Sequence, residues 1–212
     1  MKLNKENMIL YAVTDRSWLR GKSLSERVEE AIKGGATFIQ LREKQISKED
    51  FIKEAEAVKR VTDSYNIPFV INDNVEVALA VNADGVHIGQ DDEDLGAVRK
   101  NLGPNKIIGV SAHNLKEALK AEENGADYLG VGAVFSTATK KDVINISYEE
   151  IENICSKVKI PVVAIGGISK DNIMELKGRG LSGVAVVSAI FAEENVEAAA
   201  KEMLKMSKEI TY

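Results

Sequence analysis

The chain has 212 residues, of which 44% are hydrophobic and 29% charged, with 33 acidic against 28 basic residues and a formal net charge of -5. This length supplies one well-buried core and falls short of two ordinary domains, so we expect a single domain over residues 1–212. The acidic balance argues against a nucleic-acid partner. The lack of any long apolar run argues against a membrane partner. The single cysteine fits a cytoplasmic location.

Short apolar runs alternate with longer amphipathic segments along the chain. The runs are rich in Val and Ile and are bounded by Gly, Asn, Asp or Pro, a pattern typical of buried parallel strands. The expected strands are, in chain order, Ile9–Val13, Phe38–Leu41, Phe69–Ile71, Gly85–Ile88, Ile107–Val110, Tyr128–Val131, Val162–Ile165 and Gly183–Val187.

The segments between the expected strands carry helix signals. Ser23 and Glu26 have capping-box spacing, and Ser47 and Asp50 repeat it. Three expected helices have a single inward face; their faces consist of Leu24, Val28, Ala31 and Ile32, of Phe51, Ala55, Val58 and Thr62, and of Leu115, Ala118, Leu119 and Glu122. A further helix is expected from Glu149 to Lys157, which makes Cys155 a mostly buried, inert thiol.

One junction recurs where an expected helix gives way to a strand. Its copies are Gly35–Phe38, Asn82–Gly85, Gly125–Tyr128 and Gly180–Gly183. Each has a helix stop, then a small or apolar residue, and then a polar residue before the strand. A repeated turn of this kind is what a chain of βα units requires.

Eight strands, each followed by a helix, place the chain in the α/β class. They favour a single (β/α)8 TIM barrel with eight parallel strands. A doubly wound sheet is the alternative, although such sheets usually have five or six strands. Because barrel enzymes carry their chemistry at the carboxyl ends of the strands, the residues at those ends are the candidates for a site.

Three polar side chains at the end of the second expected strand share a face. Alternation along the strand points Gln40, Arg42 and Lys44 into the barrel mouth, and Ile39 and Leu41 toward the helices. Two cations and an amide at the active end favour an anion site over a polar layer held by internal ion pairs.

Carboxylates follow the next two strands. Asp73 comes directly after the third expected strand and Asp92 shortly after the fourth, so both belong to neighbouring parts of the rim. Mg²⁺ takes few protein carboxylates and completes its octahedron with waters and phosphate oxygens, which this pair suits. Helix capping is the alternative, because Asp is common where a helix begins.

The last strands end in residues suited to phosphate. Gly166 and Gly167 follow the seventh expected strand and Ser188 the eighth. Glycines let backbone N–H groups approach a ligand, and the loops after these two strands are the frequent phosphate site of the fold. The hydroxyls and lysines of residues 136–141 suit a phosphate or a polar heterocycle, with a merely hydrophilic loop as the alternative.

His87 and His113 are the only histidines in the sequence. Neither has an evident acidic or nucleophilic partner along the chain, so we expect structural or supporting roles for both. No Ser-His-Asp or Cys-His arrangement is visible.

Together, the strand-end segments resemble the thiamine-phosphate synthase family. The resemblance is carried by Leu10–Asp15, Gln40–Lys44, Asn72–Asp73, Val86–Gln90 with Asp92, Ser111, Thr137–Lys140, Gly166–Gly167 and Val187–Ile190. It extends from the first strand through the eighth, and the order and spacing of the segments are more specific than any one of them. Ala133 and Ser136 stand where the family often has proline, which puts the rigidity of that loop in question.

The resemblance implies a transferase of thiamine biosynthesis that works on small-molecule substrates with Mg²⁺ as cofactor. The enzyme would join an aminopyrimidine-methyl pyrophosphate to a thiazole phosphate and release pyrophosphate. Asp73 and Asp92 would hold the Mg²⁺, and Arg42, Lys44 and Lys140 would be catalytic cations. The substrate-binding residues would be Gln40, Leu41, Arg42, Glu43, Lys44, Asn72, Ser111 and Lys140 for the pyrimidine pyrophosphate, and Thr137, Ala138, Thr139, Gly167, Val187 and Ser188 for the thiazole phosphate.

Two other functions compete with this one. A related thiazole tautomerase shares the barrel, but it is not expected to keep the 40–44 run, the Asn72–Asp73 pair and the Thr-x-Thr-Lys run together. A non-catalytic sensor of a phosphate ligand would need the strand 7 and 8 site alone. Homo-oligomerisation is left open by the sequence.

Overall fold

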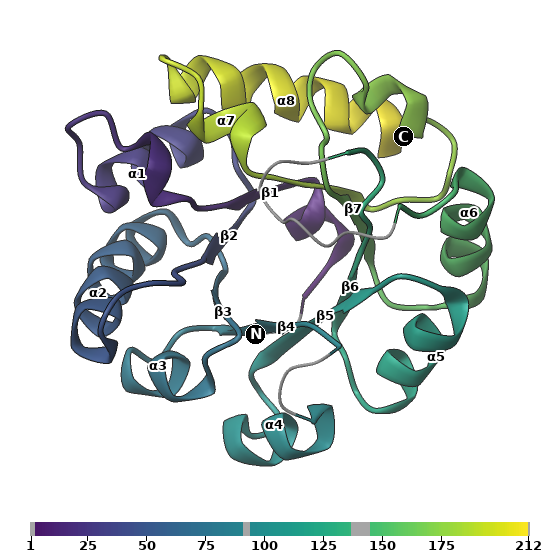
Figure 1. The fold of residues 1–212 in the computed structure, drawn as a ribbon, viewed down its shortest axis with the longest axis horizontal. Helices are drawn as coiled ribbons and strands as arrows, with labels where there is room; N and C mark the ends of the chain where they lie inside the picture. Colours follow the sequence, from purple (N-terminus) through teal and green to yellow (C-terminus); the bar gives the residue numbers. More distant parts are fainter. Residues whose placement is uncertain (1–2, 91–93, 137–144, 212) are drawn as a thin grey trace.

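Each expected run of Val and Ile forms one strand of a closed parallel barrel (Figure 1). The computed structural model describes residues 3–90, 94–136 and 145–211. The strands are β1 Leu10–Val13, β2 Phe38–Leu41, β3 Phe69–Asn72, β4 Gly85–Ile88, β5 Ile107–Ala112, β6 Tyr128–Val131, β7 Val162–Ile165 and β8 Gly183–Val186. β8 pairs with β1, so the (β/α)8 TIM barrel is confirmed and the doubly wound sheet is wrong.

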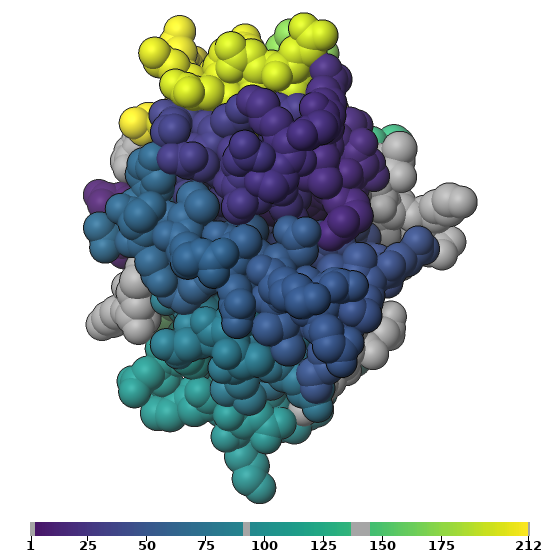
Figure 2. Space-filling view, turned by 90° about the vertical axis from the view of Figure 1, so that its left-hand side faces the viewer, coloured from purple at the N-terminus to yellow at the C-terminus, as the bar shows by residue number. Residues whose placement is uncertain are grey.

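Helices surround the barrel, and short 3-10 helices accompany them. The α-helices are α1 Leu24–Lys33, α2 Lys48–Tyr65, α3 Val75–Ala80, α4 Leu95–Leu102, α5 Leu115–Glu123, α6 Tyr148–Lys157, α7 Ser188–Phe191 and α8 Val196–Thr211. The 3-10 helices are η1 Lys5–Met8, η2 Arg16–Trp18 and η3 Ile173–Leu176. Figure 2 shows α1, α2 and α3 forming one continuous outer wall below α8.

The connection between β7 and β8 departs from the expected pattern. It contains only η3 in place of an α-helix. Gly178 and Gly180 follow with φ of 79° and 81°, so the backbone turns out of the helical region soon after η3 ends. The helical part of this connection is therefore limited to the short η3, and α8 packs against η3 on this side of the barrel.

Most helix signals have the structural role predicted for them. Ser23 and Glu26 form a reciprocal capping box at α1, and the Ser47 side chain accepts the Asp50 N–H at the start of α2. The predicted faces of α1 and α2 are buried. The predicted face of α5 is right for Ala118 and for Leu115, which packs against the core, but wrong for Leu119, which is 41% exposed. The buried residues of α5 are the small Ala118 and Ala121.

The recurring junction has one geometry in three of its copies. The first residue has a positive φ, 105° in Gly35, 52° in Asn82 and 92° in Gly125. The alanine that follows donates its N–H to the carbonyl five residues earlier in each copy. The polar third residue accepts a backbone N–H from the neighbouring strand region; the pairs are Thr37 with Leu10, Asp84 with Phe69 and Asp127 with Ile108. The repeat therefore ties each new strand to the one before it.

Replacing Asp84 with alanine tests this tie. The Phe69 N–H, which donates to Asp84 Oδ2 at 2.9 Å, would lose its acceptor in a fully buried residue. We expect the free energy of unfolding to fall by about 1–3 kcal/mol, measured by urea denaturation. Ser182→Ala is the matched control, since this side chain in the fourth copy makes no such bond among the described residues, and it should change stability by less than about 0.5 kcal/mol. Equal losses in both variants would contradict this role.

Two apolar layers hold the barrel together. One lies between strands and helices, and the other fills the barrel itself. Inside the barrel, the rings of Tyr11, Phe38 and Tyr128 pack edge to face with centroids 4.6 to 5.7 Å apart. Met8 of η1 is buried against this inner layer, so η1 closes the end of the barrel opposite the carboxyl ends of the strands (Figure 1).

Two further expectations concern Cys155 and membrane spans. Cys155 in α6 is partly buried, and burial raises the pKa of its thiol to about 11, so the thiol stays protonated and unreactive at neutral pH. Across residues 3–90, 94–136 and 145–211, no helix combines the length and apolar character needed to cross a bilayer.

Candidate active site

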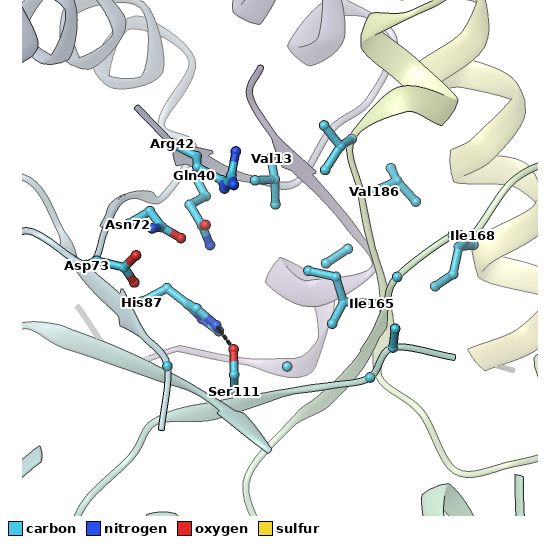
Figure 3. A pocket seen from close by; sticks show the side chains of 18 of the residues that line it. Val13, Gln40, Arg42, Asn72, Asp73, His87, Ser111, Ile165, Ile168 and Val186 are labelled. Carbon is cyan, nitrogen blue, oxygen red and sulfur yellow. Dashed lines mark hydrogen bonds between the residues drawn. The ribbon is translucent and has the colours of Figure 1, made fainter. Parts of the chain in front are cut away.

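The carboxyl ends of the strands surround a cavity of about 320 Å³. Figure 3 shows its two unlike sides. Polar side chains from β2 to β5 line one side: Gln40, Arg42, Asn72, Asp73, His87 and Ser111. Apolar side chains and glycines from β7 and β8 line the other: Ile165, Gly166, Gly167, Ile168, Val186 and Val187. The cavity is thus suited to a ligand, or a pair of ligands, with one charged and one less polar part.

The end of β2 supplies an amide and two cations, as its alternation predicts. Gln40, Arg42 and Lys44 all line the cavity. Arg42 is held through its backbone N–H, which donates to Thr14 Oγ1 at 3.0 Å. Within the described part of the chain, no carboxylate lies within 4.0 Å of the Arg42 guanidinium, so its five donors are available to a ligand.

Leu41 and Glu43 point the other way and do not line the cavity. Leu41 is fully buried in the layer between strands and helices. The Glu43 carboxylate receives two N–H groups of Arg16, with Nε to Oε2 at 2.9 Å. Both residues share the face that alternation assigns to the outside. The structure therefore does not bring these two side chains together with the other predicted binding residues.

Asp73 takes an unusual backbone conformation at the rim. Its φ is 58°, in the left-handed region that few residues other than glycine adopt, although Asp and Asn tolerate it better than most. Its Oδ2 lies 3.1 Å from Lys44 Nζ, and its side chain lines the cavity. The capping alternative is wrong for this residue, because the N-cap of α3 is Asn74. A carboxylate held in a strained conformation at a cavity is a candidate for function.

On β4 and β5, His87 and Ser111 meet below the polar side of the cavity. His87 is buried, and its Nε2 lies 3.0 Å from Ser111 Oγ (Figure 3). Gln90, which follows β4, donates through Nε2 to the Ser111 carbonyl at 2.6 Å. His87 and Gln90 line the cavity together with Val13. None of the three was predicted as a site residue, although all three lie within segments that carried the resemblance, Leu10–Asp15 and Val86–Gln90.

His113 begins the turn before α5 and also lines the cavity. Contrary to the expectation from sequence, it has an acidic partner: its backbone N–H and its Nδ1 lie 2.8 and 2.9 Å from Glu117 Oε2. The spacing of four residues at a helix start is the signal that could have revealed this pair.

The ends of β7 and β8 form a glycine-rich corner. Gly166 and Gly167 have φ of 100° and 64°. A Cβ on Gly167 would lie 2.4 Å from the Ser136 carbonyl oxygen, so only glycine fits there. Ser188 begins α7, and among the described residues the backbone N–H groups of Gly167 and Ser188 have no protein acceptor. This corner can receive an anion through backbone donors.

Five predicted site residues lie outside the described residues. They are Asp92, Thr137, Ala138, Thr139 and Lys140. The remaining predicted cavity residues, Gln40, Arg42, Lys44, Asn72, Asp73, Ser111, Gly167, Val187 and Ser188, are brought together in one cavity.

Known proteins are similar to this chain over most of its length. A family model described as thiamine monophosphate synthase matches residues 10–190. A thiamine-phosphate synthase of Clostridium botulinum is 52% identical over 200 residues, covering 94% of each chain. That of Clostridium beijerinckii is 54% identical over 194 residues, covering 92% of this chain and 93% of the relative.

A solved structure gives the same result. The thiamine phosphate pyrophosphorylase of Pyrococcus furiosus superposes with a TM-score of 0.90 at 41% sequence identity, covering 98% of this chain and 99% of the other. The family match over most of the chain, at these identities, leads to one conclusion: this chain belongs to the thiamine monophosphate synthase family.

Proposed function

We propose that this protein joins an aminopyrimidine-methyl pyrophosphate to a thiazole phosphate, giving thiamine phosphate and pyrophosphate. The observation that carries the proposal is the division of one cavity into a polar side, with the cations Arg42 and Lys44 after β2, and a glycine-rich corner at β7 and β8. Two separate anion sites suit two phosphorylated substrates. The family membership and the names of the relatives support the same reaction.

The polar side would hold the pyrimidine pyrophosphate. Arg42 and Lys44 meet its negative charge, which a chain of net charge -5 needs a local cationic site to attract. Asn72 and Ser111 add hydrogen-bonding groups at the same wall. Lys140 is proposed to join these cations from the segment outside the described residues.

The glycine-rich corner would hold the thiazole phosphate. Gly167 and Ser188 offer backbone N–H groups, and Val187 lines the cavity between them. Thr137, Ala138 and Thr139 are proposed to complete this site. The apolar side chains of Ile165 and Val186 would pack against the thiazole ring.

The reaction needs charge stabilisation more than a strong base. The bond between the pyrimidine methylene carbon and the pyrophosphate oxygen breaks, and Arg42 and Lys44 stabilise the charge that develops on the leaving group. The pyrimidinylmethyl cation left behind is stabilised by the ring amino group. The thiazole nitrogen then donates its electron pair to the methylene carbon and forms the new C–N bond. That nitrogen carries no proton, so no residue has to remove one.

The residues at the rim fit a Mg²⁺ ion. Asp73 offers a partly exposed carboxylate into the cavity, and the described residues contain no group of three or more acidic, His or Cys side chains gathered to bind a metal. Mg²⁺ accepts such a sparse set, because substrate phosphate oxygens and waters fill its other positions. We propose that Asp73 and Asp92 hold the ion, which when bound neutralises charge on the pyrophosphate.

Pyrophosphate release by the purified protein tests the proposed function. Release should require both heterocycles and Mg²⁺, and omission of either heterocycle should abolish it. An isomerase would convert the thiazole substrate alone, and a sensor would bind it without turnover. Either of these two results would contradict the proposed function. From the single cysteine we further propose a cytoplasmic location, and from the chain length we propose one working domain over residues 1–212.

Gln40 should recognise the pyrimidine ring by hydrogen bonding. Its amide carries both a donor and an acceptor, which matches an aminopyrimidine edge. In Gln40→Leu we expect kcat/KM to fall by roughly tenfold or more, the equivalent of one hydrogen bond, and preference over an analogue without the amino group to disappear. Competition kinetics with the two pyrimidines measures both effects. Unchanged preference would mean that Gln40 only fills a layer of the barrel.

A further inference from the structure

A chain of hydrogen bonds crosses the barrel interior beneath the cavity. Gln40 Nε2 donates to the hydroxyl of Tyr11, which lies 2.7 Å from the hydroxyl of Tyr128. Tyr128 Oη lies 2.9 Å from His87 Nδ1. His87 Nε2 lies 3.0 Å from Ser111 Oγ, and Figure 3 marks this last link with a dashed line. Tyr11 and Tyr128 belong to the buried inner layer and do not line the cavity. The hydrogen-bond chain therefore connects Gln40 on the cavity wall to His87 and Ser111, which also line the cavity, through two buried tyrosines.

The barrel is shaped to hold this chain in place. A Cβ on Gly109 would lie 2.1 Å from Tyr128 Cζ, and one on Gly130 would lie 3.1 Å from His87 Cε1. Glycine at both positions therefore leaves room for the two rings. Phe38 packs edge to face against both tyrosines and fixes their planes. The donors and acceptors consequently have few alternative arrangements.

The amide of Gln40 sets the direction of every proton in the chain. Burial raises the pKa of both tyrosines, so each keeps its single proton. Because Gln40 donates a hydrogen bond to the Tyr11 hydroxyl, Tyr11 must donate its own proton to the Tyr128 hydroxyl. Tyr128 must in turn donate its proton to His87 Nδ1. The proton of the neutral ring then lies on Nε2 and is donated to Ser111 Oγ.

The two ends of this hydrogen-bond chain offer opposite groups to the cavity: Ser111 offers a donor and Gln40 offers an acceptor. With its oxygen occupied as an acceptor, Ser111 can turn its own proton toward the cavity, and Gln40 keeps its carbonyl oxygen for the cavity. Among the described residues, neither group has another partner. The opposite orientation of the amide would reverse all the protons, and Ser111 would then present only lone pairs to an anion.

We propose that Tyr11, Tyr128 and His87 are positioning residues that couple recognition of the pyrimidine amino group at Gln40 to hydrogen-bond donation by Ser111 toward the pyrophosphate. The assignment of these two ligands rests on the proposed function, whereas the direction of the chain does not. A pyrimidine with an acceptor in place of its amino group would favour the reversed amide, and Ser111 would lose its donor role toward the leaving group.

The tautomer of His87 shows the direction of the hydrogen bonds between Gln40 and Ser111, and it can be measured without any substrate. In ¹⁵N NMR of the ligand-free protein above neutral pH, we expect His87 to carry its proton on Nε2. His113 provides an internal reference, because Nδ1 faces the Glu117 carboxylate, which only accepts, and should carry the proton there. A wild-type His87 with its proton on Nδ1 would overturn the proposal whatever the enzyme's activity.

Gln40→Glu tests the coupling along the chain. An ionised carboxylate can only accept, so Tyr11 and Tyr128 should both reverse, and His87 should gain a proton on Nδ1. In Gln40→Glu combined with Tyr128→Phe the chain is cut, and the Nδ1 signal should no longer respond to position 40. No response in the single variant, or the same response in both, would refute the relay.

Activity supplies a separate readout. Tyr11→Phe and Tyr128→Phe should each lower kcat/KM by about tenfold, the scale of one misdirected hydrogen bond. Tyr65→Phe removes an exposed hydroxyl bound to Glu29 and should leave kcat/KM unchanged. Full activity in Tyr128→Phe would show that Ser111 does not depend on the chain. If the wild-type protein lacks turnover altogether, the proposed function fails while the NMR result on the chain still stands.

Discussion

Replacing Asp73 with alanine is expected to lower turnover by about a hundredfold or more, the usual scale for losing a preorganised charge-stabilising group. The reason is the placement of this carboxylate at the cavity rim beside Lys44, where it would fix Mg²⁺ against the pyrophosphate. Steady-state kinetics at increasing Mg²⁺ should recover part of the loss if the metal binds more weakly, and little if the metal is misplaced.

Two companion variants separate metal binding from structure. Asp73→Asn keeps a side chain that tolerates the left-handed φ of 58°, so it should fold like the wild type yet still lose most turnover. Asn74→Ala removes the true N-cap of α3 and should cost about 1 kcal/mol in unfolding free energy while turnover per folded molecule stays the same. Full activity of Asp73→Ala at ordinary Mg²⁺, or of the wild type in excess chelator, would disprove the metal assignment.

Gly167→Ala is the second change with a large expected effect. The added methyl group would lie 2.4 Å from the Ser136 carbonyl oxygen and 2.8 Å from that of Phe135, so the glycine-rich corner must shift. Overpacking of this kind costs about 1–3 kcal/mol. We expect thiazole-phosphate binding, measured by isothermal titration calorimetry, to weaken roughly tenfold to a hundredfold. Binding of the pyrimidine pyrophosphate should change little, because its site is on the opposite side of the cavity.

Gly178→Ala controls for backbone strain. Gly178 has a similar left-handed conformation, with φ of 79°, but nothing lies within 4 Å of a Cβ built there. The Gly178→Ala protein should be less stable, because alanine disfavours this backbone conformation. It should nevertheless keep wild-type affinity for the thiazole phosphate. If both glycine variants lose affinity equally, crowding at Gly167 is not the cause, and if Gly167→Ala binds normally, the phosphate lies elsewhere.

The fold was predictable because its signals are local. Caps such as Ser23, apolar runs and the repeated junction each depend on residues close together in the chain. The exposed face of α5 was missed because Leu119 follows helical spacing as well as Ala121 does, and only packing against the barrel decides which is buried. The loss of a full helix between β7 and β8 depends on the geometry of two glycines, which spacing alone does not reveal.

The site was predictable where alternation applies. On β2, alternation places Gln40 and Arg42 in the cavity and Leu41 outside it, as observed. The hydrogen-bond chain was not predictable, because Tyr11 and Tyr128 are 117 positions apart and read as ordinary apolar strand residues. Their contact exists only once eight strands have closed the barrel.

The location of bound products tests the central claim most directly. A crystal structure of the protein with thiamine phosphate, pyrophosphate and Mg²⁺ should show pyrophosphate against Arg42, Lys44 and Asp73. The phosphate of thiamine phosphate should lie at the N–H groups of Gly167 and Ser188, with the pyrimidine amino group at Gln40. Products bound outside this cavity, or with the two phosphate sites exchanged, would contradict the account.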